Sequence, residues 1–433
     1  MKLHSTTHPA LTISFAEAVA RGMEDDGGLF VPTAIPRFSP GFFHSIGSLS
    51  FPEISFAAAR LLLDREIPDP DLRRIVDESI TFPAPLRILD GQTSVLELFH
   101  GPTLAFKDFG ARFMARTLAF LHRHDRKEIT VLVATSGDTG SAVARGFLNM
   151  EGMSVILLYP SGRVSAIQEL QLTTLGGNVT ALEIDGTFDD CQRLVKQAFA
   201  DPELSARRKL TSANSINVAR LIPQTFYYFN GYAQLPAECR PAVFSVPCGN
   251  LGNLTAGIIA WKMGLPVARF IAAANANDVL PRFLEKGVFA PAPTVATISN
   301  AMDVGNPGNF ARIFDLFGGS LTAMRRRLFS AAFSDDETRM AIRDAFDRHG
   351  YIMDPHGAVA YSALKKFREA EDASACGIIL ETAHPAKFLG VYDPIVKNAI
   401  AVPERLQSLL QGSKRSVRLP DRFADLKSFL LES

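Results

Sequence analysis

The stretch from residue 100 to 113 contains one lysine, Lys107, close to the aromatic rings of Phe106 and Phe109. A turn ahead of it is expected to lead into a helix over about residues 108–122. Aromatic neighbours keep water from an ammonium group, so we expect the pKa of Lys107 to fall. A neutral lysine amine can hold an aldehyde as an imine, which is how pyridoxal phosphate is bound. The alternative is an ordinary lysine whose amine reaches solvent along an amphipathic helix.

Two further loops contain groups that could bind anions. Residues 247–253 read Pro-Cys-Gly-Asn-Leu-Gly-Asn and lie between an expected strand and an expected helix. Glycine lets a backbone approach a ligand, and free N–H groups at a helix start favour a phosphate, although a plain turn fits equally well. The loop 135–140 offers the hydroxyls of Thr135 and Ser136 and the carboxylate of Asp138. It could hold a substrate carboxylate, or its side chains could simply cap a helix.

A third polar group follows an apolar strand late in the chain, where Thr382 comes two residues after Leu380. A neutral hydroxyl facing the ring nitrogen of a pyridine cofactor would leave that nitrogen largely unprotonated, whereas a carboxylate would keep the proton there. His384 precedes a proline and is interpreted as a turn residue without a catalytic role.

These loops need elements that bring them together, and the hydrophobic pattern predicts two α/β lobes. Apolar, β-branched runs alternate with helical patterns, which favours right-handed crossovers and parallel sheets. A ligand crevice is then expected at the carboxyl ends of the strands. The expected strands are 129–134, 155–158, 179–184, 242–246 and 267–273, and the expected helices are 141–149, 164–175, 188–199, 217–232 and 253–262.

The first 80 residues follow a different pattern, which predicts a small, mainly helical N-terminal domain. Residues 81–433 are interpreted as one catalytic unit. Within it we expect a smaller lobe over about 101–214, a larger lobe over about 215–400 and a helical tail.

Composition excludes several classes of function. The 433 residues are 47% hydrophobic, enough for a large core, and 45 basic residues balance 45 acidic ones. The chain has no net charge that would favour binding to nucleic acid or to an anionic membrane, so a small-molecule partner is expected. Four scattered cysteines without a Cys-x-x-Cys pair argue against a metal site or disulfides. With no signal peptide and no run of membrane-spanning length, we expect a soluble, cytoplasmic protein. Oligomeric state is not readable from the sequence.

Taken together, several segments resemble the threonine synthase family, pyridoxal-phosphate enzymes of the tryptophan synthase β group with fold type II. The combination spans nearly the whole chain, so it is more specific than any single loop. The segments that carry the resemblance are 14–32, 100–108, 134–140, 214–217, 249–253, 300–309 and 381–385.

The resemblance implies that Lys107 holds pyridoxal phosphate and that O-phospho-L-homoserine and water become L-threonine and phosphate. Many members of the family have asparagine at the position of Asp138, although the branch with a longer N-terminal domain has aspartate. The implied cofactor contacts beside Lys107 are Asp138, Gly249, Asn250, Leu251, Gly252, Asn253 and Thr382. The implied substrate contacts are Thr135, Ser136, Asn217, Arg220 and Lys387.

Two other functions stay open from the sequence. A related phospho-lyase with the same cofactor would release 2-oxobutyrate, ammonia and phosphate, and analysis of the products would distinguish it. A binding protein of the same fold without turnover is the more distant alternative, and the presence of Lys107 argues against it.

Overall fold

The largest sheet contains β10 and β13, the strands that precede the 249–253 loop and Thr382. The computed structural model describes residues 1–24, 26–125, 127–410 and 412–432. Six strands follow the spatial order β12-β11-β10-β13-β5-β4, and all neighbours are parallel except β4 and β5. The strands are β4 (Leu86–Ile88), β5 (Thr93–Glu97), β10 (Ala242–Pro247), β11 (Val267–Ala274), β12 (Leu328–Ala332) and β13 (Gly377–Glu381).

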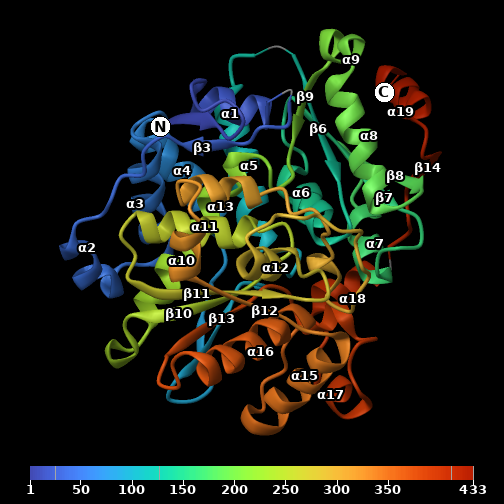
Figure 1. Ribbon diagram of the computed structural model, residues 1–433. Coiled ribbons are helices and arrows are strands. Elements are labelled where there is room, and N and C mark those ends of the chain that lie inside the picture. The colour runs from blue at the N-terminus through green and yellow to red at the C-terminus, as the bar shows by residue number, and fades with distance from the viewer. Residues whose placement is uncertain (25, 126, 411, 433) are drawn as a thin grey trace.

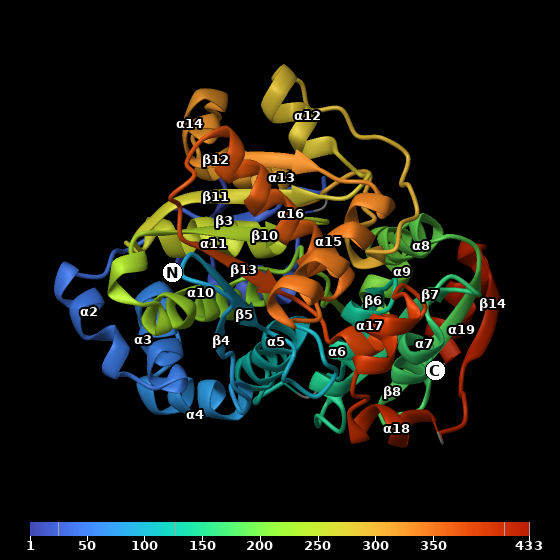
Figure 2. The same ribbon diagram turned by 90° about the horizontal axis from the view of Figure 1, so that it is seen from below.

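The smaller sheet has five strands in the order β14-β8-β7-β6-β9, and every neighbouring pair is parallel. Figures 1 and 2 show it beside the larger sheet, with α5 between them. Strand β6 is buried along its whole length, because helices cover both faces of a parallel sheet. The strands are β6 (Ile129–Ala134), β7 (Met153–Pro160), β8 (Val179–Asp185), β9 (Lys209–Ser212) and β14 (Val417–Pro420).

Helices separate the strands of both sheets, as the alternating pattern predicts. Around the smaller sheet they are α5 (Lys107–Leu121), α6 (Asp138–Phe147), α7 (Ala166–Thr173), α8 (Phe188–Ala200) and α9 (Pro202–Arg207). In the larger lobe they are α10 (Ile222–Gln234), α11 (Gly252–Lys262), α12 (Val279–Lys286), α13 (Phe310–Leu316), α14 (Leu321–Arg327), α15 (Asp335–His349) and α16 (Pro355–Ala370). Within the described residues, no helix is long and apolar enough to span a membrane.

The N-terminal section contains a small antiparallel sheet in addition to the expected helices. Its strands are β1 (Lys2–Ser5), β2 (Thr12–Ser14) and β3 (Phe30–Pro32), in the order β2-β1-β3. Strands of three or four residues leave too short an alternation for the sequence to indicate a sheet. The helices are α1 (Phe15–Arg21), α2 (Pro40–Ser45), α3 (Phe51–Leu63) and α4 (Asp69–Ser79), and capping boxes start α1 and α3.

The C-terminal tail is not purely helical, contrary to the expectation. Strand β14 pairs with β8 through Val417↔Leu182 and the three residues that follow. This strand is short and largely exposed, so it lacks the apolar run that identifies a buried strand. The tail helices are α17 (Pro394–Ala399), α18 (Glu404–Leu410) and α19 (Phe423–Glu432).

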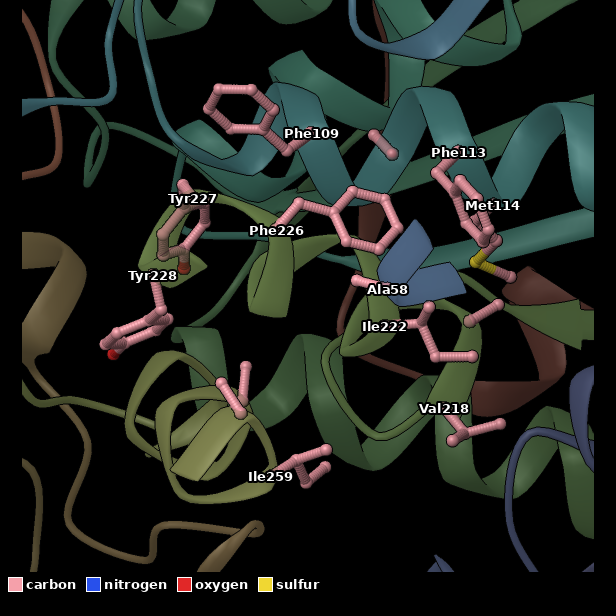
Figure 3. Close-up of a cluster of buried hydrophobic side chains, with 14 of the residues drawn as sticks. Ala58, Phe109, Phe113, Met114, Val218, Ile222, Phe226, Tyr227, Tyr228 and Ile259 are labelled. Carbon is pink, nitrogen blue, oxygen red and sulfur yellow. The ribbon is translucent and has the colours of Figure 1, made fainter. Parts of the chain in front are cut away.

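A buried aromatic cluster fixes α5 against the larger lobe (Figure 3). Phe113 of α5 meets Phe226 of α10 with ring centroids 5.7 Å apart, and Phe109 meets Tyr227 at 5.6 Å. Full burial of a phenylalanine side chain contributes about 2–3 kcal/mol. The helix that begins at Lys107 is therefore anchored by its own buried face.

Candidate active site

Lys107 is the first residue of α5, and the turn ahead of it closes on the next side chain, Asp108. The backbone N–H and the hydroxyl of Thr103 each donate to the buried carboxylate of Asp108 at 2.8 Å. A Cβ at Gly101 would lie 2.4 Å from an Asp108 oxygen, so glycine is required there. Burial raises the pKa of Asp108 to about 6. Gly101, Thr103 and Asp108 therefore fix the shape of the turn before Lys107.

The turn is joined directly to the end of β13. The N–H of Phe106 donates to the carbonyl of Thr382 at 2.9 Å, and the N–H of His384 donates to the carbonyl of Leu104 at 3.1 Å. These bonds bring Thr382 next to Lys107, although the two residues lie 275 positions apart. The Thr382 hydroxyl bonds to no other group in the described part of the chain, so it is available to a ligand.

The amine of Lys107 is held away from bulk water. Its side chain is 16% exposed, and Nζ lies 4.0 Å from Oδ2 of Asp138 and 5.7 Å from the ring centroid of Phe106. Burial lowers the pKa of Lys107 to about 8, Asp138 opposes the shift, and the cations Lys387 and Arg220 add to it. This geometry favours the imine-forming lysine over the solvated one.

Asp138 begins α6 and is bound through one of its two oxygens. Oδ1 accepts from Lys387 Nζ at 2.5 Å and from Gln168 Nε2 at 3.0 Å. The nearby cations hold the pKa of Asp138 well below its usual range despite burial. Asp138 thus lies beside Lys107, and it is ionised.

In the loop after β6, the hydroxyls of Thr135 and Ser136 differ in their hydrogen bonds. The Thr135 hydroxyl accepts from the N–H groups of Gly137 and Gly140, at 3.0 and 2.8 Å, and the Thr135 N–H donates to Leu158. Ser136 is partly exposed, and its hydroxyl has no partner among the described residues. Thr135 therefore shapes the loop, while Ser136 has a free hydroxyl for a ligand.

The loop from residue 249 to 253 has the features of a phosphate cradle. Leu251 has a φ of +60°, and α11 begins at Gly252, so the N–H groups here point away from the helix body. Those of residues 249–252 have no acceptor among the described residues. The Asn250 side chain donates to Ser215 Oγ at 2.6 Å and accepts from the Gly308 N–H at 2.5 Å.

The side chain of Asn253 differs from the rest of this loop because it is bound to α10. Its Oδ1 accepts from the hydroxyls of Tyr227 and Tyr228 at 2.7 and 2.8 Å, which ties the start of α11 to α10. Its Nδ2 is buried without a partner. One side of this amide is therefore structural, and the other is available to an acceptor.

Two of the expected substrate contacts have structural roles. Asn217 is fully buried; it donates to the carbonyls of Val19 and Ser212, at 2.9 and 3.1 Å, and accepts from the Ala219 N–H. Lys387 is fully buried, and it donates to Asp138 and to the carbonyl of Thr103. Both N–H groups of Asn217 and two of the three N–H groups of Lys387 are used inside the protein, so the structure favours positioning roles for these side chains. Val19 and Asp138 lie far along the chain from Asn217 and Lys387, so the sequence could not indicate these partners.

Arg220 fits the expected role better. Nη1 donates to the carbonyl of Ala213, while Nε is buried without a partner. A Cβ at Gly110 of α5 would lie 2.7 Å from Nε, so glycine lets the guanidinium reach the helix of Lys107. Burial lowers the pKa of Arg220 to about 10, which leaves it a cation at neutral pH.

A buried acid–imidazole group was missed by the sequence analysis. Asp354 Oδ1 binds the Nδ1 of His356, whose Nε2 accepts from the N–H of Ala301 at 3.1 Å. Asp354 Oδ2 accepts from the N–H of Ala383 at 3.1 Å, next to Thr382. Burial and the neighbouring Asp354 raise the pKa of Glu381 far above its ordinary value. The Asp-Pro-His run before a helix was the available signal.

The residues present fit pyridoxal phosphate. The free N–H groups at the start of α11 and the open Thr382 hydroxyl follow the neighbouring strands β10 and β13, and Lys107, with its lowered pKa, follows a turn hydrogen-bonded to Thr382. These groups match the phosphate, the ring nitrogen and the aldehyde of the cofactor in turn.

Comparisons with protein-family models agree with this chemistry. Residues 93–380 match the pyridoxal-phosphate dependent enzyme family, residues 2–80 match the threonine synthase N terminus, and residues 357–430 match the threonine synthase C-terminal family. The chain belongs to the threonine synthase family. Its members depend on pyridoxal phosphate, so the resemblance, fold class and cofactor expected from the sequence are confirmed.

Individual threonine synthases match the chain over its full length. The enzyme of Haemophilus influenzae is 46% identical over 437 residues and covers 100% of both chains. The crystal structure of threonine synthase from Escherichia coli superposes with a TM-score of 0.92, 43% identity and full coverage of both chains. The PLP-bound threonine synthase of Brucella melitensis gives a TM-score of 0.91 at 35% identity, covering 100% and 99% of the chains.

Proposed function

We propose that this chain converts O-phospho-L-homoserine and water into L-threonine and inorganic phosphate, with pyridoxal phosphate held by Lys107. The observation that carries the proposal is the position of Lys107, whose side chain is 16% exposed and whose Nζ lies 4.0 Å from Oδ2 of Asp138, next to Thr382; burial lowers its pKa to about 8. Membership of the threonine synthase family supports the choice of reaction.

The cofactor would be held by residues from three loops. The N–H groups of residues 249–252 would bind its phosphate, and the Thr382 hydroxyl would face its ring nitrogen. Bound pyridoxal phosphate supplies an electron sink that stabilises negative charge on the substrate α-carbon. The neutral hydroxyl of Thr382 would donate a hydrogen bond to the ring nitrogen and leave that nitrogen largely unprotonated.

The substrate would be bound by groups that the structure leaves free. Ser136 offers a hydroxyl to the substrate carboxylate, at the loop that Thr135 shapes. Arg220 offers the substrate phosphate a buried cation, whose Nε packs against Gly110, three residues after Lys107 in α5. Charge-assisted hydrogen bonds of this kind are roughly twice as strong as neutral ones.

Lys107 would move the protons of the reaction. In the net change, the C–O bond at the γ-carbon breaks, a hydroxyl from water is attached at the β-carbon, and the γ-carbon becomes a methyl group. A flexible amine with a pKa near 8 can take and return protons at neighbouring carbons close to neutral pH. The low exposure of the amine also limits competition from stray water.

The test is to incubate the purified protein with pyridoxal phosphate and O-phospho-L-homoserine and to quantify phosphate and threonine together. Equal amounts of both products are expected. Phosphate accompanied by 2-oxobutyrate and ammonia would replace the proposal with the phospho-lyase. Cofactor binding without any product would replace it with a binding protein.

We also propose a cytoplasmic location and a domain boundary near residue 80. All four cysteines are free thiols, which suits a reducing compartment. The N-terminal sheet uses only strands before residue 33, and α4 ends at Ser79. Beyond this boundary, β5 pairs with β13, so residues 81–100 would belong with the larger lobe.

A further inference from the structure

The two carboxylate oxygens of Asp138 have different environments. Oδ1 accepts hydrogen bonds from Lys387 and Gln168, while Oδ2 is directed toward Lys107, with Nζ at 4.0 Å. A carboxylate held by one oxygen cannot rotate freely, so its second oxygen has a fixed direction. The hydrogen bonds to Oδ1 therefore fix the position of Oδ2 relative to the amine of Lys107.

Lys387 reaches this carboxylate from the other lobe. Asp138 begins α6 in the smaller lobe, whereas Lys387 lies in the short 3-10 helix Pro385–Phe388 that follows β13 of the larger sheet. The Lys387 side chain is fully buried, and its second acceptor is the carbonyl of Thr103 in the turn before Lys107. One ammonium group thus joins its own segment to two others that build the site.

We propose that Lys387 is a positioning residue that binds Oδ1 of Asp138 across the two lobes and thereby fixes Oδ2 beside Lys107. The inference rests on the proposed function for the role of Lys107 and deepens it. Lys387 and Asp138 form a buried pair, and removal of one partner leaves an uncompensated charge next to the reacting amine.

The charges that face Lys107 determine the direction of each effect. They are the carboxylates of Asp138 and Asp354 and the cations of Lys387 and Arg220. Lys387→Met removes a repulsive cation, so Lys107 should hold its proton to higher pH. Asp138→Asn removes an attractive carboxylate, so Lys107 should lose its proton at lower pH. In the double variant the two effects oppose each other.

The experiment follows the capture of pyridoxal phosphate by the full chain freed of cofactor. Only the neutral amine attacks the aldehyde, so the stopped-flow rate plotted against pH reports the titration of Lys107. Relative to the unchanged protein, the midpoint should rise by about one pH unit in Lys387→Met and fall by about one in Asp138→Asn. The double variant should return to within about half a unit. Lys397→Met, at an exposed position of α17, is the matched control for loss of one positive charge.

A midpoint in Lys387→Met equal to that of Lys397→Met would overturn the inference. A rise in KM for O-phospho-L-homoserine without any midpoint shift would also overturn it, because Lys387 would then act as a phosphate ligand. A double variant that stays as shifted as either single variant would show general disruption instead of a compensated pair. Failure of the unchanged protein to capture pyridoxal phosphate would instead refute the proposed function.

Discussion

At the scale of single residues, burial and charge act on Lys107 in opposite directions. Loss of water lowers the pKa of the amine, Asp138 raises it, and the remaining effect leaves a value of about 8. An exposed lysine has a pKa near 10.4, and each pKa unit of difference changes the neutral fraction about tenfold. Burial therefore supplies the neutral amine that a reaction with an aldehyde requires.

Lys107→Ala should abolish covalent attachment of pyridoxal phosphate and reduce kcat/KM for O-phospho-L-homoserine by about 10³-fold or more. Borohydride reduction of the coloured protein, followed by peptide mass analysis, measures the attachment. The exposed Lys397→Ala is the control and should retain both properties. Cofactor bound covalently to a different lysine would contradict the assignment.

His384→Asn should make the protein less sensitive to acid. Burial, together with the cations His100 and Arg405, lowers the pKa of His384 to about 4, against the opposing carboxylates Glu97 and Asp354. The unfolded chain binds this proton near pH 6.5, so stability is lost as pH falls from 6.5 to 4.

This loss in the free energy of unfolding is on the order of 1–2 kcal/mol, because partial exposure of the ring reduces the effect of the pKa shift. His384 Nδ1 accepts from the Ala386 N–H, and an asparagine oxygen can provide the same cap. Urea unfolding at pH 7.5 should therefore give similar free energies for both proteins, and at pH 4.5 the variant should lose less. Equal losses at pH 4.5 would exclude His384 as the responsible group.

At the scale of elements, the phosphate loop depends on a close approach of two backbones. A Cβ at Gly249 would lie 2.8 Å from the Cα of Met302 and 3.0 Å from the carbonyl oxygen of Ala301. The same segment is held from its other side by His356, which accepts from the Ala301 N–H. Backbone atoms held from two sides can move only at a large cost in free energy. Gly249 is therefore needed for close packing as well as for ligand access.

Gly249→Ala should destabilise the protein by about 1–3 kcal/mol and weaken pyridoxal phosphate binding, because the segment around Ala301 must move. Gly91→Ala is the matched control, since nothing lies within 4 Å of the added Cβ. Denaturant unfolding and cofactor titration measure the two effects. The same free energy of unfolding in both variants would contradict the close-packing argument.

Asn217→Ala should destabilise the fold without changing KM for the substrate. Its amide joins the carbonyl of Val19 at the end of α1 to that of Ser212 at the end of β9. Loss of this buried donor removes one hydrogen bond from each carbonyl, at about 1–3 kcal/mol for the two. Steady-state kinetics under conditions in which the variant remains folded give KM, and a tenfold increase would restore Asn217 as a substrate contact.

At the scale of the whole molecule, the site is assembled at the junction of two lobes. Lys387 of the larger lobe binds Asp138 of the smaller one, and Asn300 donates to Gln168 at 3.4 Å across the same junction. Hydrogen bonds of this kind can lengthen or shorten with small rotations of one lobe relative to the other.

We expect the lobes to close over a bound substrate analogue, because exclusion of water protects the reaction from side routes. Small-angle X-ray scattering of the cofactor-loaded protein should show a smaller radius of gyration with the analogue than without it. Loading with inorganic phosphate alone is the control. Identical curves with and without the analogue would argue against closure.

Much of this organisation could be predicted from the sequence, because regular alternation of strands and helices is a local signal. Lys107, Thr382 and the 249–253 loop were found because each follows a strand or a turn that the sequence marks clearly. The partners of Asn217 and Lys387 could not be found in this way. Both depend on contacts across nearly 200 residues or more, for which one sequence contains no pattern.

The pairing of β14 with β8 also has a consequence for biosynthesis. The edge strand of the smaller sheet lies at residues 417–420 of 433, whereas its neighbour β8 ends at Asp185. During translation, β8 therefore stays an open edge until the ribosome has made residues 417–420, and open edges invite mispairing. Pairing of β14 with β8 closes this edge of the smaller sheet.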